Sequence, residues 1–447
     1  MTSINFRGDL FAAAASFSAQ GLIRLGSSLI LTRMLQPEAY GIITILMSLV
    51  FFVEMLSDIG VTVFIVRDSN GDRPEYLNTA WTLRLARSLL NGTLLFGAAP
   101  LIAAWIYHAP ALTGPLRIFS LWFVISGFES MSFPLATRRK RSRIVMYSEL
   151  AATFLSTVFT IIYCSYSRNY WGMVYGILLN RLLITLMSYL YYPEMRPRPQ
   201  IDRAAMRAVL KMTRFTVPSG LLTLLLSQFD KIVFLRLFSL DLLGVYGLAG
   251  SIAAPIDSLV SNICHMVLYP RCAHDFNSDR NTFVSKYYSG NTKLLISILI
   301  MPAAVGGAAH LIIALLYDPR YAQAAVILQA FMIRSALLAL ATPAEDLLIA
   351  AGETQVILIG SLLRAAFVVA GSLTGYYLYG LPGFAYGMGL SGLPPLLYYW
   401  RLQRNKGFLR GRYELYRVVF VVGVAICALI VGNWLLMSWD VRQIRLR

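Results

Sequence analysis

Long, uninterrupted apolar runs are the feature that most restricts how this chain can fold. Hydrophobic residues make up 57% of the 447 positions, and charged residues only 14%. A run of about 20 apolar residues, coiled into a helix, spans the ~30 Å hydrocarbon core of a bilayer. The runs are continuously apolar rather than alternating, which favours helices over a β-barrel. We therefore predict an all-α polytopic membrane protein.

Thirteen such spans are predicted along the chain. They cover residues 10–34, 42–66, 79–106, 117–136, 144–164, 171–192, 215–237, 242–268, 291–316, 322–350, 356–378, 381–400 and 415–437. With the amino terminus in the cytoplasm, six loops face inward, and five of these six are rich in Lys or Arg, as the positive-inside rule requires. A thirteenth crossing places the basic tail after Trp439 outside. Either the last segment is a partial or re-entrant hairpin, or the number of spans differs from thirteen.

The net charge of +17 is concentrated in these inward loops, so we exclude nucleic acid as a partner. No nucleotide-binding, esterase or zinc-peptidase motif occurs, and we expect neither an enzyme nor a bound cofactor. The cysteines lack metal-ligand spacing and are interpreted as packing residues; they are Cys164, Cys264, Cys272 and Cys427. The first span lacks the features of a cleavable signal and is expected to remain in the protein.

A motif from the first two spans returns about 203 residues later. Its members keep their order and spacing: Arg33, Glu38, Gly41 and Glu54 recur as Arg236, Asp241, Gly244 and Asp257. Because six spans precede the second copy, the repeat is parallel, with its axis along the membrane normal. The sequence thus predicts two six-helix lobes, residues 1–192 and 215–400, joined by a cytoplasmic linker at 193–214. Residues 401–447 add a basic loop and at least one extra C-terminal span.

The linker contains a possible amphipathic helix. Ile201, Ala205, Val209 and Met212 are spaced for one helical face, flanked by basic residues. We expect this helix to lie along the inner membrane surface, and the alternative is a disordered linker.

Ionisable residues within the spans are the main functional signal, because such groups are costly in a membrane unless they face water or a partner. The cations favour an anionic substrate, since an arginine fork matches phosphate oxygens in two hydrogen bonds. The predicted substrate-binding cations are Arg24, Arg181, Arg334 and Arg364. The candidates for a gate or for ion coupling are Glu54, Asp58, Asp230, Lys231 and Asp257.

Three arrangements of these charges remain open. Spans one, two, seven and eight could surround a hydrated cleft that the paired charges line, the pairs could lock the two lobes together, or they could be salt bridges between helices without substrate contact. Glu129 is ambiguous, and Glu149 is interpreted as a partner of the nearby basic loop. Glu38 and Asp241 are expected near helix starts, where the dipole favours acids, and Gly41 and Gly244 are expected to permit close helix packing.

Several ordered segments resemble those of a known family. Residues 31–41 (LTRMLQPEAYG) and 57–60 (SDIG) are similar to segments of the Wzx-type polysaccharide flippases, within the multidrug/oligosaccharidyl-lipid/polysaccharide exporter superfamily. The second half adds Pro218, the pair 230–231 (DK) and residues 243–249 (LGVYGLA), 268–271 (LYPR), 316–321 (LYDPRY) and 350–353 (AAGE). The resemblance covers nearly the whole chain in order, although related proteins usually have twelve or fourteen spans.

This resemblance implies a two-lobe flippase of the bacterial inner membrane. It would move undecaprenyl-diphosphate-linked oligosaccharide to the periplasmic leaflet by alternating access, for exopolysaccharide, capsule or O-antigen (lipopolysaccharide) biosynthesis. The implied partners are the lipid-linked oligosaccharide, membrane lipid and, as a possibility, a polysaccharide polymerase and a chain-length regulator. The alternatives are an ion-coupled drug exporter of the same superfamily and a membrane polymerase or ligase. The short outer loops count against the enzyme.

Overall fold

The regular secondary structure is helical throughout the part of the chain that the computed structural model describes, as the sequence predicts. The model describes residues 6–68, 70–139, 141–190, 197–209, 233–234, 237–278 and 282–445, and this part of the chain contains no strand. The chain divides into two compact units, Met1–Gly244 and Val245–Arg447. Each unit is described separately.

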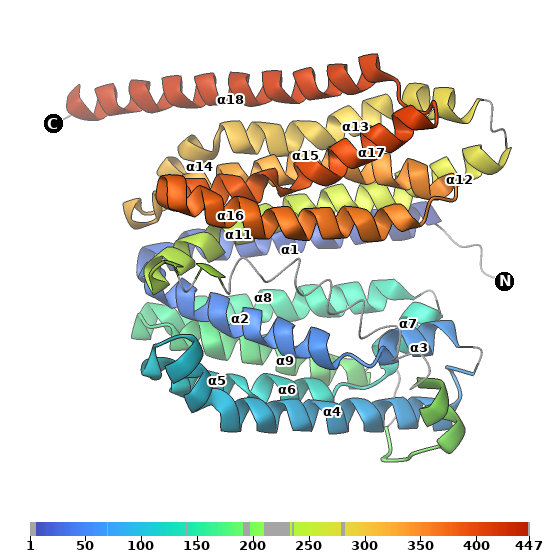
Figure 1. The fold of residues 1–447 in the computed structure, drawn as a ribbon. Helices are drawn as coiled ribbons and strands as arrows, with labels where there is room; N and C mark the ends of the chain where they lie inside the picture. Colours follow the sequence, from blue (N-terminus) through green and yellow to red (C-terminus); the bar gives the residue numbers. More distant parts are fainter. Residues whose placement is uncertain are drawn as a thin grey trace. The chain divides into compact units, whose positions relative to one another are not determined.

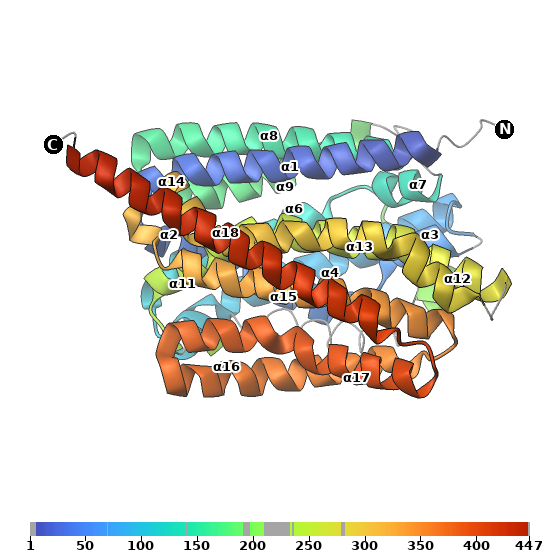
Figure 2. The ribbon, with the colours of Figure 1, turned by 90° about the horizontal axis from the view of Figure 1, so that it is seen from above.

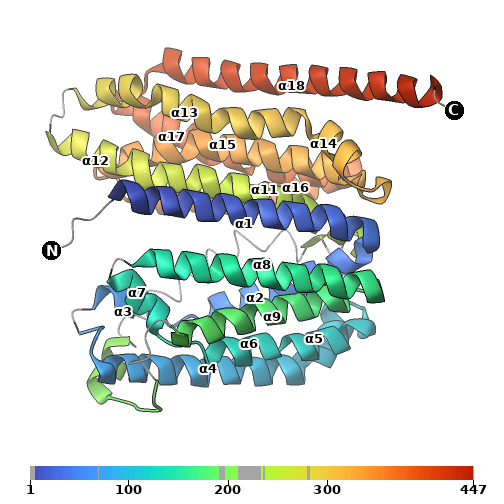
Figure 3. The same ribbon diagram turned by 180° about the vertical axis from the view of Figure 1, so that it is seen from behind.

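The first unit is a bundle of long and short helices. Helix α1 packs against α8, α8 against α9, and α4 against α6; Figures 1 and 3 show the last two contacts. Its elements are α1 (Phe6–Met34), α2 (Pro37–Ser57), α3 (Val61–Arg67), α4 (Pro74–Leu101) with the π-helix η1 (Ile102–Ile106), η2 (Pro110–Leu112), α5 (Thr113–Phe119), α6 (Leu121–Gly127), α7 (Ser132–Arg138), α8 (Ser142–Ser167) and α9 (Trp171–Leu190).

The predicted span 42–66 is wrong as a single helix. It breaks at residues 58–60 into α2 and α3, and Gly60 has the left-handed φ of 72°. The Asp58 carboxylate accepts a hydrogen bond from the Gly60 amide at 2.9 Å, which forms an Asx turn. The Asp58 carboxylate therefore stabilises the turn between α2 and α3, in addition to carrying a charge.

The predicted span 117–136 is also broken. It consists of α5, α6 and α7, and the segment before the break is bent by 51° relative to α7. The non-helical backbone between Gly127 and Ser132 lies within a candidate span. Such backbone is tolerated at membrane depth only where protein groups satisfy it or water reaches it.

The linker contains the predicted helix. Residues 203–209 are helical, and Ala205 and Val209 are fully buried, so this segment is not the disordered linker of the alternative interpretation. Val209 packs with Phe64, Leu77 and other apolar residues of the first unit. Met212 lies outside the described residues.

Gly41 and Gly244 lie against neighbouring backbone within the first unit. A Cβ atom on Gly41 would overlap the Leu240 carbonyl oxygen, and one on Gly244 would overlap the Pro37 carbonyl oxygen. This confirms the prediction that both glycines permit close helix packing. Glu38 and Asp241 occupy the first turns of their helices, also as predicted.

The second unit begins within α11. Helix α15 packs against α13 and α16, and α18 packs on α13; Figure 2 shows that α18 crosses α13 obliquely. Its elements are α11 (Leu240–Ile263), the π-helix η3 (Cys264–Leu268), α12 (Tyr269–Ser278), α13 (Phe283–Gly307), α14 (Ala309–Leu316), η4 (Pro319–Tyr321), α15 (Ala324–Ala350), α16 (Gln355–Gly389), η5 (Leu390–Gly392), α17 (Leu393–Asn405) and α18 (Gly411–Arg445).

The apolar stretch Gln355–Asn405 is a helical hairpin that turns at Gly380. Gly380 has a φ of 62° and a ψ of −135°, far from helical values. On the two sides of the turn, a Cβ on Gly375 would overlap the Gly383 carbonyl, and a Cβ on Gly387 would overlap the Gly371 carbonyl. The two legs therefore run closely side by side (Figure 2), as predicted for the spans 356–378 and 381–400.

The C-terminal segment is one continuous helix. Helix α18 has no break between Gly411 and Arg445, which excludes the re-entrant hairpin as its structure. Nine helices of the described residues are long and apolar enough to cross a membrane, or ten with the bent pair. Counting the hairpin legs separately and adding α1 accounts for every predicted span except 215–237, which lies almost entirely outside the described residues.

Candidate functional site

Hydroxyl groups of α9 form hydrogen bonds with backbone groups in and beside the break of the fourth span. The Ser130 amide donates to the Ser188 hydroxyl at 2.9 Å, and the Thr185 hydroxyl donates to the Ile125 carbonyl at 3.1 Å. The Tyr189 hydroxyl donates to the Phe128 carbonyl. These bonds hold an irregular backbone segment in place at membrane depth, as in the discontinuous helices of transporters.

Glu129 lies in this break and joins two arginines from two other helices. Its carboxylate lies 2.9 Å from the Arg84 guanidinium of α4 and also pairs with Arg181 of α9. Glu129 is only 7% exposed, so its charge depends on these two partners. The Arg181 guanidinium lies over the Trp122 ring, 5.1 Å from its centroid. Arg181, a predicted substrate cation, is thus held in a network.

A second ion-pair group of the first unit lies between α2 and α4. Arg87 lies 3.0 Å from the Glu54 carboxylate and 3.6 Å from that of Asp58. It also donates to the Ser57 carbonyl at 3.3 Å. Both acids were predicted as gate or coupling residues, and the structure brings them together on one arginine.

Arg24 lies apart from these two groups. It is exposed on α1, and its charge acts on Glu149 of α8. The Gln20 side chain, one turn earlier on α1, lies near the same carboxyl. Glu149 therefore faces α1 rather than only the basic loop.

In the second unit, Asp257 of α11 is held by two consecutive residues of α15. The Arg334 guanidinium lies 2.8 Å from one carboxylate oxygen, and the Ser335 hydroxyl donates to the other. Arg334 also lies over the Phe331 ring, 4.8 Å from its centroid. This places two predicted site residues in direct contact.

A pocket of about 230 Å³ opens beside this pair. Arg364 of α16 lines it together with Asp257, Glu345 and Tyr399. Arg364 forms no hydrogen bond or ion pair with the part of the chain that the structure describes, and its Nε is buried without a partner. The Tyr399 hydroxyl lies close to the Glu345 carboxyl. A side chain at Gly360 would overlap that hydroxyl, so the glycine lets Tyr399 approach α16.

The pocket combines groups that suit an anion with two acidic residues. It presents the Arg364 guanidinium, which has no ion pair with a described residue, the hydroxyls of Ser261 and Ser361, the Asp257–Arg334 pair and the Glu345 carboxyl. The described residues contain no cluster of side chains suited to a metal ion. The arrangement favours binding through charge-assisted hydrogen bonds.

Comparison with known families agrees with the fold and the sequence. A family model described as "Polysaccharide biosynthesis protein" matches residues 30–326, more than half of the chain. The chain belongs to the polysaccharide biosynthesis protein family.

Two curated proteins are similar to this chain in sequence. The amylovoran biosynthesis protein AmsL of Erwinia amylovora is 27% identical over 260 residues, which cover 58% of this chain and 66% of that protein. The succinoglycan biosynthesis transport protein ExoT of Rhizobium meliloti (strain 1021) is 24% identical over 245 residues, which cover 54% of this chain and 48% of ExoT. The chain thus spans less than two thirds of either relative.

Two solved structures share the fold. The lipid II flippase MurJ, in an inward closed conformation, matches with a TM-score of 0.70 and 13% identity, covering 97% of this chain and 99% of MurJ. An inward-facing multidrug resistance transporter of the MATE family matches with a TM-score of 0.65 and 13% identity. The match covers 87% of this chain and 94% of the transporter chain. At this identity the likeness shows the fold alone.

Sequence reasoning found part of this family member's charge network. Asp230 and Lys231 lie outside the described residues. The partner arginines Arg84 and Arg87 were missed, although both lie in a predicted span three residues apart, on one helical face. Glu345 and the buried Asp346 were also missed, and their position within the predicted span 322–350 was the available signal.

Each ion pair of the candidate site joins residues of the same unit. Glu129 with Arg84 and Arg181, and Glu54 and Asp58 with Arg87, lie in the first unit; Asp257 with Arg334 lies in the second. These pairs therefore connect helices inside each unit. Of the predicted cations, Arg364 is the one that lines a described pocket without an ion pair to a described residue.

Proposed function

We propose that this protein flips a polyprenyl-diphosphate-linked oligosaccharide, with undecaprenol as the expected lipid, from the cytoplasmic to the periplasmic leaflet of the bacterial inner membrane. The observation that carries the proposal is the pocket in the second unit, where Arg364 lies unpaired among membrane-spanning helices. The family and the relatives named for amylovoran and succinoglycan support a role in the assembly of an extracellular polysaccharide.

The diphosphate is the part of this substrate that needs the pocket. Its oxygens carry the charge that a lipid bilayer opposes most strongly. In the proposal the Arg364 guanidinium donates two parallel hydrogen bonds to it. Arg334, held by Asp257, adds positive charge at the edge of the pocket. The polyprenyl chain stays in the lipid, so the pocket has to enclose only the headgroup.

Alternating access is the mode of transport that we propose. Protonation of Glu54, Asp58 or Asp257 would release the paired arginine, so each acid is a candidate for coupling to an ion gradient. Arg24 and Arg181 are proposed to contribute positive charge along the path in the first unit. Asp230 and Lys231 stay sequence-based candidates for a gate.

Topology and partners complete the proposal. The basic inward loops predict a cytoplasmic amino terminus. A polysaccharide polymerase and a chain-length regulator would act on the product after it reaches the periplasmic leaflet. No nucleic acid is expected to bind.

The test is the leaflet distribution of lipid-linked oligosaccharide in cells that lack the protein. We expect the precursor to accumulate in the inner leaflet on deletion, and wild-type protein to restore its outward movement. R364Q should fail to restore it, R364K should restore it in part because it keeps the charge but loses the fork, and the exposed control R404Q should restore it fully.

Two outcomes would contradict the proposal. An unchanged distribution on deletion, in cells without a second flippase, would favour the drug-exporter alternative, which the MATE-like fold permits. Full restoration by a well-expressed R364Q would instead exclude the pocket of the second unit as the diphosphate site.

A further inference from the structure

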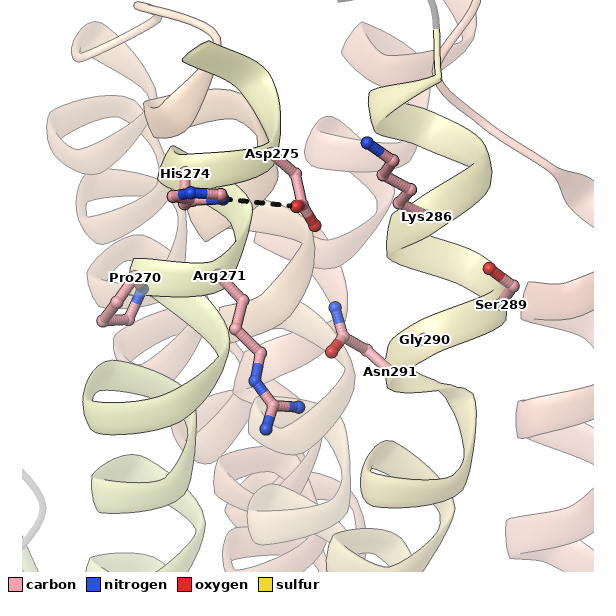
Figure 4. A pocket seen from close by; sticks show the side chains of 8 residues that line it. All are labelled: Pro270, Arg271, His274, Asp275, Lys286, Ser289, Gly290 and Asn291. Atoms are coloured by element: carbon pink, nitrogen blue, oxygen red, sulfur yellow. Dashed lines mark ion pairs between the residues drawn. The ribbon is translucent and has the colours of Figure 1, made fainter. Parts of the chain in front are cut away.

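A larger pocket lies between α12 and α13, away from the Arg364 pocket. It encloses about 480 Å³, a size typical of small-molecule sites. Figure 4 shows that its side chains come from two helices that face one another. The lining residues are Pro270, Arg271, His274, Asp275, Lys286, Ser289, Gly290 and Asn291.

The pocket carries a net positive charge. Arg271 of α12 and Lys286 of α13 are exposed and form no ion pair with any residue that the structure describes. The carboxylate in the pocket, Asp275, lies 3.7 Å from His274. Among the described residues, two cations without an ion pair and one carboxylate leave an excess of at least one positive charge, which favours an anionic ligand.

Two neighbouring residues of α13, Asn291 and Gly290, supply the pocket with an uncharged hydrogen-bond donor and with open space. Asn291 is 3% exposed, and its side chain points between the two helices in Figure 4. Its side chain forms no hydrogen bond with a described residue, and its polar atoms are not fully buried, so its amide is available to a ligand. Gly290 beside it has open space where a Cβ would be.

The ends of the neighbouring apolar spans place the pocket at the level expected for lipid headgroups. The apolar span of α11 ends at Ile263, and Arg271 follows about two turns later, at 1.5 Å per residue. Lys286 and Asn291 lie in the first turns of the span Phe283–Gly307. In the second unit, the loop between α17 and α18 lies at the same end of the bundle (Figure 1) and carries further basic residues.

We propose that this pocket binds the phosphate of an anionic glycerophospholipid headgroup, in the leaflet that the basic loops face. Arg271 and Lys286 bind the phosphate oxygens from two sides, and the Asn291 amide and Ser289 hydroxyl donate to the remaining oxygens or to the glycerol. Basic pockets between membrane helices on the cytoplasmic side are suited to such headgroups. A soluble phosphate compound offers the same chemistry, and the experiment distinguishes the two sources.

The experiment titrates the purified full-length protein in detergent with phosphatidylglycerol, phosphatidylcholine and inorganic phosphate, and reads bound lipid by native mass spectrometry. We expect saturable binding of phosphatidylglycerol and none of phosphatidylcholine above background. The double variant R271Q/K286Q should bind phosphatidylglycerol at least about tenfold more weakly, because two charge-assisted contacts are lost. The matched double variant R401Q/R404Q, with the same charge change on exposed residues outside the pocket, should bind within about twofold of wild type.

A second variant tests the pocket without changing its charge. Gly290→Leu places a side chain in the open space and should weaken phosphatidylglycerol binding by a similar factor while leaving thermal unfolding near that of wild type. Competition by millimolar inorganic phosphate, with direct binding of phosphate, would support the phosphate site and assign it to a soluble ligand. Equal losses in R271Q/K286Q and R401Q/R404Q, or unchanged binding in both R271Q/K286Q and Gly290→Leu, would overturn the proposal.

Discussion

The Arg334 guanidinium lies 2.8 Å from the Asp257 carboxylate, and the Ser335 hydroxyl donates to the second oxygen of the same group. Two consecutive residues of α15 thus fix one acid of α11. Both charged side chains are largely shielded from solvent, at 20% and 25% exposure. A charge at such a position depends on its partner more than a surface charge does.

This relationship predicts strong coupling between the two residues. D257N and R334Q should each lower the free energy of unfolding by about 1–3 kcal/mol, because each leaves its partner without its charge-assisted bond. The double variant D257N/R334Q should be no less stable than the worse single variant. Thermal unfolding of the detergent-solubilised protein, analysed as a double-mutant cycle, measures this coupling. Additive losses would show that the pair contributes no interaction energy.

Glu129 should be more important for stability than Glu54. E129Q leaves Arg84 and Arg181 without their shared carboxylate in a buried position, whereas E54Q leaves Arg87 with Asp58. We expect E129Q to lower the free energy of unfolding by about 3–5 kcal/mol, and E54Q by about 1 kcal/mol. Comparing the midpoints of thermal unfolding under one condition decides the order. A smaller effect of E129Q would mean that the two arginines find other partners.

The hairpin glycines predict a steric effect on stability. A Cβ at Gly375 would overlap the Gly383 carbonyl, so G375A has to push the two legs of the hairpin apart. We expect a loss of about 1–3 kcal/mol from overpacking. The control is G423A on α18, where nothing lies within 4 Å of the added atom and alanine is the better helix former. The yield of folded protein in size-exclusion chromatography and its unfolding midpoint report both variants, and equal behaviour would contradict the close contact.

The sequence predicts the spans better than their interruptions. Span positions follow from apolar length, which is a local property, and the Gly380 turn falls between two predicted spans. The break at residues 58–60 depends on one Asx turn and one positive φ. The break around Glu129 depends on hydroxyls of α9, more than fifty residues away in the chain.

The sequence predicts which charged residues lie within the spans, but it does not predict which acid pairs with which arginine. A charge within a span is visible in the sequence, and helical spacing places Arg84 and Arg87 on one face. Which acid meets which arginine depends on how helices neighbour one another, and this is set by tertiary packing. Arg181 and Arg364 are therefore alike in the sequence, yet Arg181 pairs with Glu129 and Arg364 lines a pocket.

The turn at Gly380 predicts that the tip of the hairpin lies on the opposite side of the membrane from its two ends. Single cysteines at exposed positions test this: Tyr379→Cys at the turn, and Thr354→Cys and Arg404→Cys at the two ends. Cys427→Ser supplies the background, because Cys427 is the one exposed native thiol and the other three are buried. Burial also raises the pKa of Cys272 to about 12, so little reactive thiolate forms there.

The expected labelling follows from the basic loops. A membrane-impermeant maleimide should label Tyr379→Cys in intact cells, and Thr354→Cys and Arg404→Cys only after the inner membrane is permeabilised. The opposite pattern would reverse the orientation of the second unit while keeping the hairpin. Labelling of all three positions from one side would contradict the hairpin itself, because a turn at Gly380 between two full-length spans places its tip across the membrane from both ends.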